Sequence, residues 1–130
     1  AYAAVIPLFI DALRAGRAPE VHGDGKQSRD FTFIDDVVAA NMRAATAPAE
    51  ACSGRAYNIA GGGAVSLLEM LDLRGEILDV TPEPRHTEPR PGDVRHTRAD
   101  ISAAERDLGH VPAVDFGDGL ERTVAWFTSR

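Results

Sequence analysis

The 130-residue sequence contains little cysteine and little lysine, and it has no long hydrophobic run. Cys52 is the single cysteine, which excludes an internal disulfide and favours a reducing, cytoplasmic location. No apolar run approaches the roughly 20 residues that a membrane helix requires, and no basic segment followed by an apolar one marks a signal peptide. We therefore expect no membrane partner.

Positive charge is also scarce, because 20 acidic residues outnumber 14 basic ones and the net charge is -6. Nucleic-acid binding depends on dense positive charge, so we expect no nucleic-acid partner. The four histidines lack the i, i+3 or i, i+4 spacing of paired metal ligands, which predicts no metal site. At 44% hydrophobic and 26% charged, the composition is typical of a single domain over residues 1–130 that buries its own core.

Hydrophobic periodicity and punctuation by glycine and proline predict an α/β fold with a few short strands and about five helices. A Ser66/Glu69 capping box opens one helix, Asp35 and Asp100 are expected to cap two others, and Gly109 is expected to end the helix that Asp100 starts. Gly75 weakens an interior helical turn. The expected helices span 6–15, 35–47, 66–78, 100–108 and 117–128, and the expected strands span 20–22, 29–34, 56–59 and 83–87.

Several chemical motifs are incomplete. Gly61–Gly63 follows a predicted strand, but Ser66 stands where a dinucleotide fingerprint requires glycine, so we interpret the glycines as a tight connection. Asp35 and Asp36 are expected to be a helix cap and its first turn rather than paired catalytic carboxylates. Cys52 has no neighbouring base in the sequence, which argues against a nucleophile.

Two arginines stand in more informative surroundings. Arg29 is predicted at the mouth of a strand, where it suits a phosphate, although pairing with Asp30 or Asp24 explains it equally well. In Arg90-Pro91-Gly92-Asp93 a cation and a carboxylate stand three residues apart on a constrained loop. Such a pair can read a diphosphate next to a ribose diol, and the alternative is a weak surface salt bridge.

These segments resemble the carboxy-terminal substrate domain of the extended short-chain dehydrogenase/reductase family, in its NAD-dependent epimerases and dehydratases. The resemblance rests on Gly23-Asp24-Gly25-x-Gln27-x-Arg29-Asp30-Phe31, on Tyr57-Asn58-Ile59 and on Arg90-x-Gly92-Asp93. It extends over nearly the whole chain through Leu108-Gly109-His110-x-Pro112 and Trp126-Phe127. Gly92-Asp93-Val94-Arg95-His96 is more similar to UDP-glucose and UDP-N-acetylglucosamine 4-epimerases than to dTDP-glucose dehydratases.

The resemblance implies a role for each matching residue. It implies that Arg29 and Arg90 grip the diphosphate of a UDP-sugar and that Asp93 binds the ribose. Val21 and His22 would border the uracil, with His22 standing where family members often carry an aromatic residue. The helix start at Val5 would bring backbone amides near the phosphates.

The family carries its NAD site and its Tyr-x-x-x-Lys pair on an amino-terminal Rossmann domain. Tyr2 and Tyr57 have no lysine four residues later, so this chain is expected to hold no catalytic residue and to bind no NAD itself. Because the chain begins with Ala1 and not with methionine, we expect it to be a fragment of a longer protein. Loss of the other domain would leave an exposed apolar face around Val5, Ile6 and Phe9. The parent enzyme of such a fragment can form a homodimer.

Three hypotheses follow for function. The chain is the UDP-sugar-binding half of an NAD-dependent sugar 4-epimerase, inactive alone; or it belongs to a dehydratase or decarboxylase of the same family; or it is a free-standing, non-catalytic binding module. An upstream reading frame with the glycine fingerprint and Tyr-x-x-x-Lys would exclude the third.

Overall fold

The computed structural model describes residues 4–129, so the expectations for Ala1 and Tyr2 lie outside the described residues. Across that range the α/β prediction is confirmed, although a short helix that was not predicted raises the expected five helices to six. No helix among residues 4–129 is both long and apolar enough to cross a lipid bilayer. The elements are α1 (Val5–Arg14), β1 (Glu20–His22), β2 (Ser28–Arg29), α2 (Ile34–Thr46), α3 (Ala49–Cys52), β3 (Val65–Ser66), α4 (Leu67–Leu78), β4 (Arg85–Thr87), α5 (Ser102–Leu108) and α6 (Phe116–Thr128).

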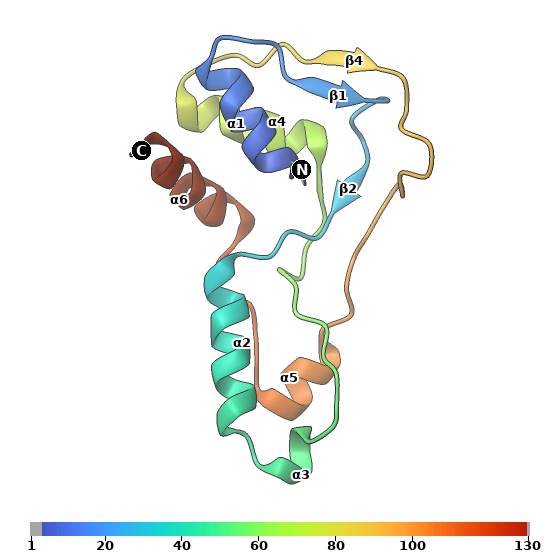
Figure 1. Ribbon diagram of the computed structural model, residues 1–130, viewed down its shortest axis with the longest axis vertical. Helices are drawn as coiled ribbons and strands as arrows, with labels where there is room; N and C mark the ends of the chain where they lie inside the picture. Colours follow the sequence, from blue (N-terminus) through green and yellow to red (C-terminus); the bar gives the residue numbers. More distant parts are fainter. Residues whose placement is uncertain (1–3, 130) are drawn as a thin grey trace. The chain divides into compact units, whose positions relative to one another are not determined.

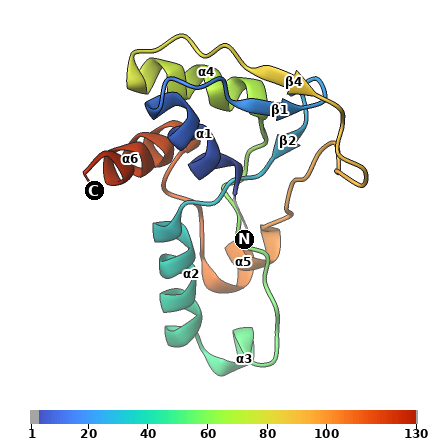
Figure 2. The ribbon, with the colours of Figure 1, turned by 45° about the horizontal axis from the view of Figure 1, so that its top comes forward.

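The described chain divides into two compact units. The first contains residues 4–28, 65–96 and 120–129, and in it α1 lies beside α4 while β1 runs parallel to β4 (Figures 1 and 2). Val21 of β1 stands opposite His86 of β4. Large apolar side chains from the helices and from β1 form the core of this unit: Phe9, Ile10, Val21, Met70, Leu71, Leu120 and Val124.

Helix α4 begins and ends as local chemistry dictates. The predicted capping box is confirmed, because the Ser66 hydroxyl accepts from the Glu69 amide and the Glu69 carboxylate accepts from the Ser66 amide. Gly75 does not end the helix. A Cβ there would lie 2.6 Å from both Pro82 Cδ and the Val80 carbonyl oxygen, so glycine lets the chain return closely over α4.

Arg74 of α4 is fully buried in the same unit and ties α4 to α1. Its Nη1 donates to the Ile6 carbonyl at 2.6 Å, and its guanidinium carbon lies 5.7 Å from the centre of the Phe9 ring. Burial lowers the pKa of Arg74 to about 10. The guanidinium stays protonated at neutral pH and takes part in a cation–π contact.

The second unit contains residues 29–64 and 97–119, in which α2, α3 and α5 lie together (Figure 1). Its buried apolar side chains are mostly alanine: Ala40, Ala60, Ala104 and Leu108. On α2, by contrast, Ile34, Val38 and Met42 are more than half exposed and recur every four residues. We call these three residues the α2 stripe.

Two strand predictions were wrong in this unit. The predicted strand 29–34 is reduced to β2, because Asp30 accepts a hydrogen bond from the Ala99 amide and the Phe31 ring packs against Phe116 at 5.1 Å. Residues 56–59 form no strand. The Tyr57 hydroxyl instead donates to the Ala51 carbonyl. A strand needs a partner backbone, which a local sequence pattern cannot supply.

Two predicted helix caps and one predicted exposure require correction. Helix α2 begins at Ile34 with Phe33 as N-cap, so Asp35 lies in the first turn and is not the cap. Helix α5 begins at Ser102 with Ile101 as N-cap, so Asp100 is not its cap, although Asp100 Oδ1 accepts from the Ser102 amide at 2.9 Å. On α1, Phe9 is only 3% exposed because it belongs to the core, which overturns its predicted exposure. Val5 and Ile6 are partly buried, and Leu8 is the exposed apolar residue of that helix.

Candidate functional site

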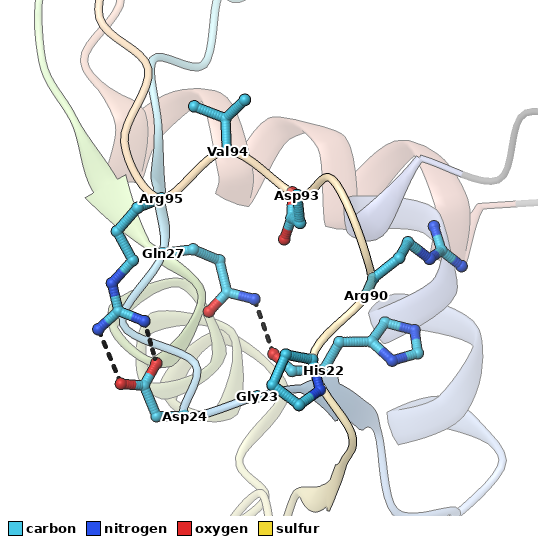
Figure 3. Close-up of a pocket in the computed structure, with 9 residues that line it drawn as sticks. His22, Gly23, Asp24, Gln27, Arg90, Asp93, Val94 and Arg95 are labelled. Atoms are coloured by element: carbon cyan, nitrogen blue, oxygen red, sulfur yellow. Dashed lines mark hydrogen bonds and ion pairs between the residues drawn. The ribbon is translucent and has the colours of Figure 1, made fainter.

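The carboxyl ends of β1 and β4 open into a hollow of about 280 Å³ within the first unit. Turn residues after β1 form one side of it, and the loop after β4 forms the other. The lining residues are His22, Gly23, Asp24, Gln27, Pro89, Arg90, Asp93, Val94 and Arg95 (Figure 3).

The turn after β1 is shaped by its glycines and fastened to α4. Gly25 has φ of +74°, and a Cβ there would lie 2.8 Å from the Leu68 side chain. The Leu68 amide donates to the Gly25 carbonyl at 3.2 Å, and the Leu67 amide donates to the Gln27 carbonyl at the same distance. Glycine is therefore required at position 25 both by the left-handed conformation and by the close approach of α4.

The loop after β4 carries the predicted cation and carboxylate. Gly92 has φ of +79°, and the Asp93 amide donates to the Arg90 carbonyl at 3.1 Å, which closes a turn between them. In Figure 3 the Asp93 carboxylate points into the hollow. The Arg90 guanidinium points away from Gln27, on the side of the His22 ring. The two charged groups are therefore presented in different directions.

Gln27 is a lining residue that the sequence reasoning missed. Its side chain is 7% exposed, and its Nε2 donates to the His22 carbonyl at 2.8 Å. Its Oε1 is buried and has no hydrogen-bond partner among the described residues. That oxygen is a buried acceptor at the wall of the hollow whose hydrogen-bonding capacity no described residue uses. The sequence signal was its position two residues before Arg29, on the same face of an extended segment.

Asp24 and Arg95 form an ion pair at the edge of the hollow. Arg95 donates from Nη1 to Asp24 Oδ1 at 2.8 Å and from Nη2 to Oδ2 at 2.7 Å. The Arg95 hydrogen bonds, together with one from the Lys26 amide, lower the pKa of the Asp24 carboxyl to about 2. The pKa of Arg95 is raised, chiefly by its hydrogen bond to Asp24. Both groups therefore stay charged at neutral pH.

The predicted site residues are only partly brought together. His22, Arg90 and Asp93 line one hollow, whereas Val21, adjacent in β1, is fully buried and does not line it. Val5 lies at the start of α1, where no side chain caps the helix, and it does not line the hollow. Arg29 belongs to the second unit.

The Gly61–Gly63 segment does not fit a dinucleotide phosphate site. A Cβ at Gly61 would collide with the Phe31 carbonyl oxygen, and Gly62 has φ of +80°. Close packing therefore accounts for Gly61 and a left-handed turn for Gly62. The sequence contains no complete Gly-x-Gly-x-x-Gly fingerprint.

The chain is similar to several known proteins. The family described as NAD dependent epimerase/dehydratase matches residues 1–60. A UDP-glucose 4-epimerase of Mycolicibacterium smegmatis is 35% identical, over 98% of this chain and 40% of the relative. A dTDP-glucose 4,6-dehydratase of Streptomyces griseus is 36% identical, over 95% of this chain and 37% of the relative.

Among solved structures, the UDP-glucuronic acid 4-epimerase of Bacillus cereus in complex with UDP-glucuronic acid and NAD aligns with a TM-score of 0.92 at 28% identity. The alignment covers 98% of this chain and 40% of that protein. The chain thus spans about two fifths of the length of the relatives it matches.

Proposed function

We propose that the chain is part of a member of the NAD-dependent epimerase/dehydratase family, to which it is similar, and that it forms the UDP-sugar-binding half of a UDP-hexose 4-epimerase. The observation that carries this proposal is the hollow beside β1 and β4, in which Arg90 and Asp93 stand on one Gly92 turn. A nucleoside diphosphate presents anionic oxygens next to a ribose diol, which are the groups that a guanidinium and a carboxylate bind.

The proposed roles follow from the chemistry of each side chain. Arg90 binds the diphosphate, and Asp93 accepts hydrogen bonds from the ribose hydroxyls. His22, at the end of β1, borders the uracil, with its Nδ1 held 2.8 Å from the Thr87 hydroxyl. Gln27 offers its unpartnered Oε1 to a donor of the nucleoside. Arg29 and the first amides of α1 at Val5 are further candidates for the phosphates.

The sugar chemistry is proposed to occur with groups outside these 130 residues. NAD supplies hydride transfer in the whole enzyme, and the chain's own glycine loop does not fit that cofactor. Nucleotide binding by this chain would position the reacting sugar, so that binding energy far from the sugar supports catalysis. We propose that 1–130 acts as one substrate-binding part and has no turnover alone.

The α2 stripe supports a second partner, an amino-terminal dinucleotide-binding domain. Ile34, Val38 and Met42 are 62%, 54% and 61% exposed, while the buried apolar side chains of the same unit are mostly alanine. An exposed helix face with apolar side chains larger than those in the core of its own unit is expected to be buried against another domain. Val38→Lys should weaken association with a separately produced NAD-binding half of a relative, whereas Ala39→Lys, also exposed on α2, should not.

A dehydratase of the same family is the second candidate, because the Streptomyces dehydratase matches the chain as well as the epimerase does. A cytoplasmic location is part of either proposal. The two candidates differ in the expected nucleotide, UDP for the epimerase and dTDP for the dehydratase. Parallel NMR titrations with UDP and dTDP distinguish them, and tighter binding of dTDP would favour the dehydratase.

The main test is an NMR titration of the chain with UDP. Changes in the amide chemical shifts monitor the titration and detect binding even at millimolar affinity. Arg90→Ala should abolish the binding, because the diphosphate loses its guanidinium partner. Arg106→Met is the matched control, because Arg106 is exposed and does not line the hollow. Equal binding by Arg90→Ala and the wild type would contradict the site.

A further inference from the structure

The loop that carries Arg90 and Asp93 has no core residue to hold it. Every residue from 88 to 94 is exposed, including Val94 at 57%. Burial therefore cannot fix the positions of the two charged groups, and the loop must be positioned through its ends.

The amino-terminal end of the loop is fastened to the end of β1. The Gly23 amide donates to the Thr87 carbonyl at 2.9 Å, and His86 Nδ1 lies 2.7 Å from the Gly23 carbonyl oxygen. These contacts continue the β1–β4 pairing into the turn, so this end is set by backbone hydrogen bonds.

The carboxyl-terminal end is fastened to the same turn, five residues further on. The Ser28 amide donates to the Arg95 carbonyl at 2.9 Å, and the Ser28 hydroxyl lies 2.8 Å from His96 Nδ1. The Arg95 guanidinium adds the bidentate contact to Asp24, across 71 positions of sequence. Both residues of the Asp24–Arg95 pair line the hollow (Figure 3).

Asp24 and Arg95 are too exposed for this pair to be explained by global stability. Their side chains are 48% and 54% exposed, and pairs this accessible contribute little to folding because water screens them. The bidentate geometry nevertheless restricts both partners to one arrangement. Such a contact can order a loop without stabilising the whole fold.

We propose that Asp24 and Arg95 are positioning residues, which hold the loop so that Arg90 and Asp93, although they point in different directions, both contact one nucleoside diphosphate. This inference rests on the proposed function. Arg95 is engaged by Asp24 and does not itself bind the phosphates, so Arg90 is the cation of this loop that reads the ligand. The loop is thereby ordered before the ligand arrives, which lowers the entropic cost of binding.

The test compares UDP affinity, measured by NMR titration, with thermal stability. Arg95→Met and Asp24→Asn should each weaken UDP binding by about tenfold, because the loop must then be ordered on binding. Neither should change the melting temperature measurably. Arg95→Lys keeps the charge but loses the bidentate contact, so its UDP affinity should lie between the affinities of these two variants and of the wild type. Arg106→Met, which removes another bidentate contact of an exposed arginine, with Asp107, is the control that should bind normally.

A charge swap separates positioning from direct contact. Asp24→Arg combined with Arg95→Asp should recover most of the affinity, since the pair is restored with its charges exchanged. In addition, ¹⁵N relaxation of the ligand-free Arg95→Met variant should show greater motion at Arg90–Asp93 than in the wild type.

The failures are distinguishable. A wild-type chain without UDP binding would overturn the proposed function and this inference together. Normal binding by both single variants would overturn the inference alone. Loss of binding in Arg95→Met but not in Asp24→Asn would also overturn it, because Arg95 would then contact the ligand directly.

Discussion

Segment 29–36 and loop 88–95 both place arginine close to aspartate, but the structure uses their carboxylates differently. In the first segment, Asp30 accepts from the Ala99 amide, and the buried Asp36 accepts from the Ala113 and Val114 amides at 2.8 and 3.4 Å. In the second, Asp93 is exposed and points into a hollow (Figure 3). Similar residue pairs therefore serve backbone organisation in one place and a candidate binding site in the other.

Burial is the physical difference between the two regions. Asp36 is 2% exposed, so its carboxylate must be satisfied by protein groups, and the backbone amides of residues 113 and 114 satisfy it. Asp93 and Arg90 are both exposed, so a ligand can reach them. A carboxylate near an arginine indicates a site only when the surrounding chain leaves it accessible.

The largest expected effect comes from removing the buried carboxylate. Asp36→Ala should lower the free energy of unfolding by about 3 kcal/mol, because two amides lose a charged acceptor in a buried setting. Urea denaturation measures the change. Asp35→Ala on the exposed side of the same helical turn is the control, with little effect expected. An equal loss in both variants would remove the contrast between the two regions.

Gly25→Ala tests the turn to which loop 88–95 is fastened. It should lower the free energy of unfolding by about 2 kcal/mol more than Gly16→Ala does. Both positions have positive φ, but only a Cβ at Gly25 would collide with the Leu68 side chain. Thermal unfolding of the two variants measures the difference. Equal costs would mean that conformational strain alone explains the glycine.

Asp93→Asn tests whether the exposed carboxylate reads the ribose. The wild type should bind UDP about tenfold more tightly than 2′-deoxy-UDP, and the variant should lose most of that preference. NMR titration with both nucleotides measures the ratio. Asp11→Asn, an exposed substitution on α1, should leave the ratio unchanged, and a preference retained by Asp93→Asn would assign the ribose to another residue.

The smallest effect is expected from acid. The pKa of Asp24 is depressed from 3.8 to about 2, so its contribution is fully present above pH 3.8 and is lost only as the pH falls through about 2. The Asp24–Arg95 contact should persist unchanged between pH 7 and pH 4. The carboxyl carbon shift of Asp24, followed by NMR, reports it. A midpoint near 4 would indicate that the ion pair does not form in solution.

Local signals predicted the helices well. The Ser66/Glu69 capping box and the left-handed Gly109 both act within a few residues, so position and residue type are sufficient to place them. The extended segment 56–59 failed for the opposite reason, since β structure depends on a neighbouring backbone that the local pattern does not contain. The sequence likewise could not distinguish a first-turn acid from a buried acceptor at Asp36, because that role depends on the distant residues 113 and 114.

Of the four charged residues that line the hollow, Arg90 and Asp93 were predicted as site residues, whereas Asp24 and Arg95 were not. Arg90 and Asp93 were identified from their three-residue spacing, and His22 from its place in the family motif. The unpartnered oxygen of Gln27 and the pairing of Asp24 with Arg95 were not. Both depend on which segments lie beside the turn after β1.

The sequence by itself determined the α/β class, the helix boundaries near strong caps, the similarity to epimerases and dehydratases, and the lack of a Tyr-x-x-x-Lys pair and of a dinucleotide fingerprint. Each of these follows from residue types at short spacing. The tertiary structure decided which carboxylates are buried and which meet water, and it joined the turn after β1 to a loop about 70 positions later. Long-range contacts set the accessibility and orientation of a charged group, and these decide whether it stabilises a backbone or binds a ligand.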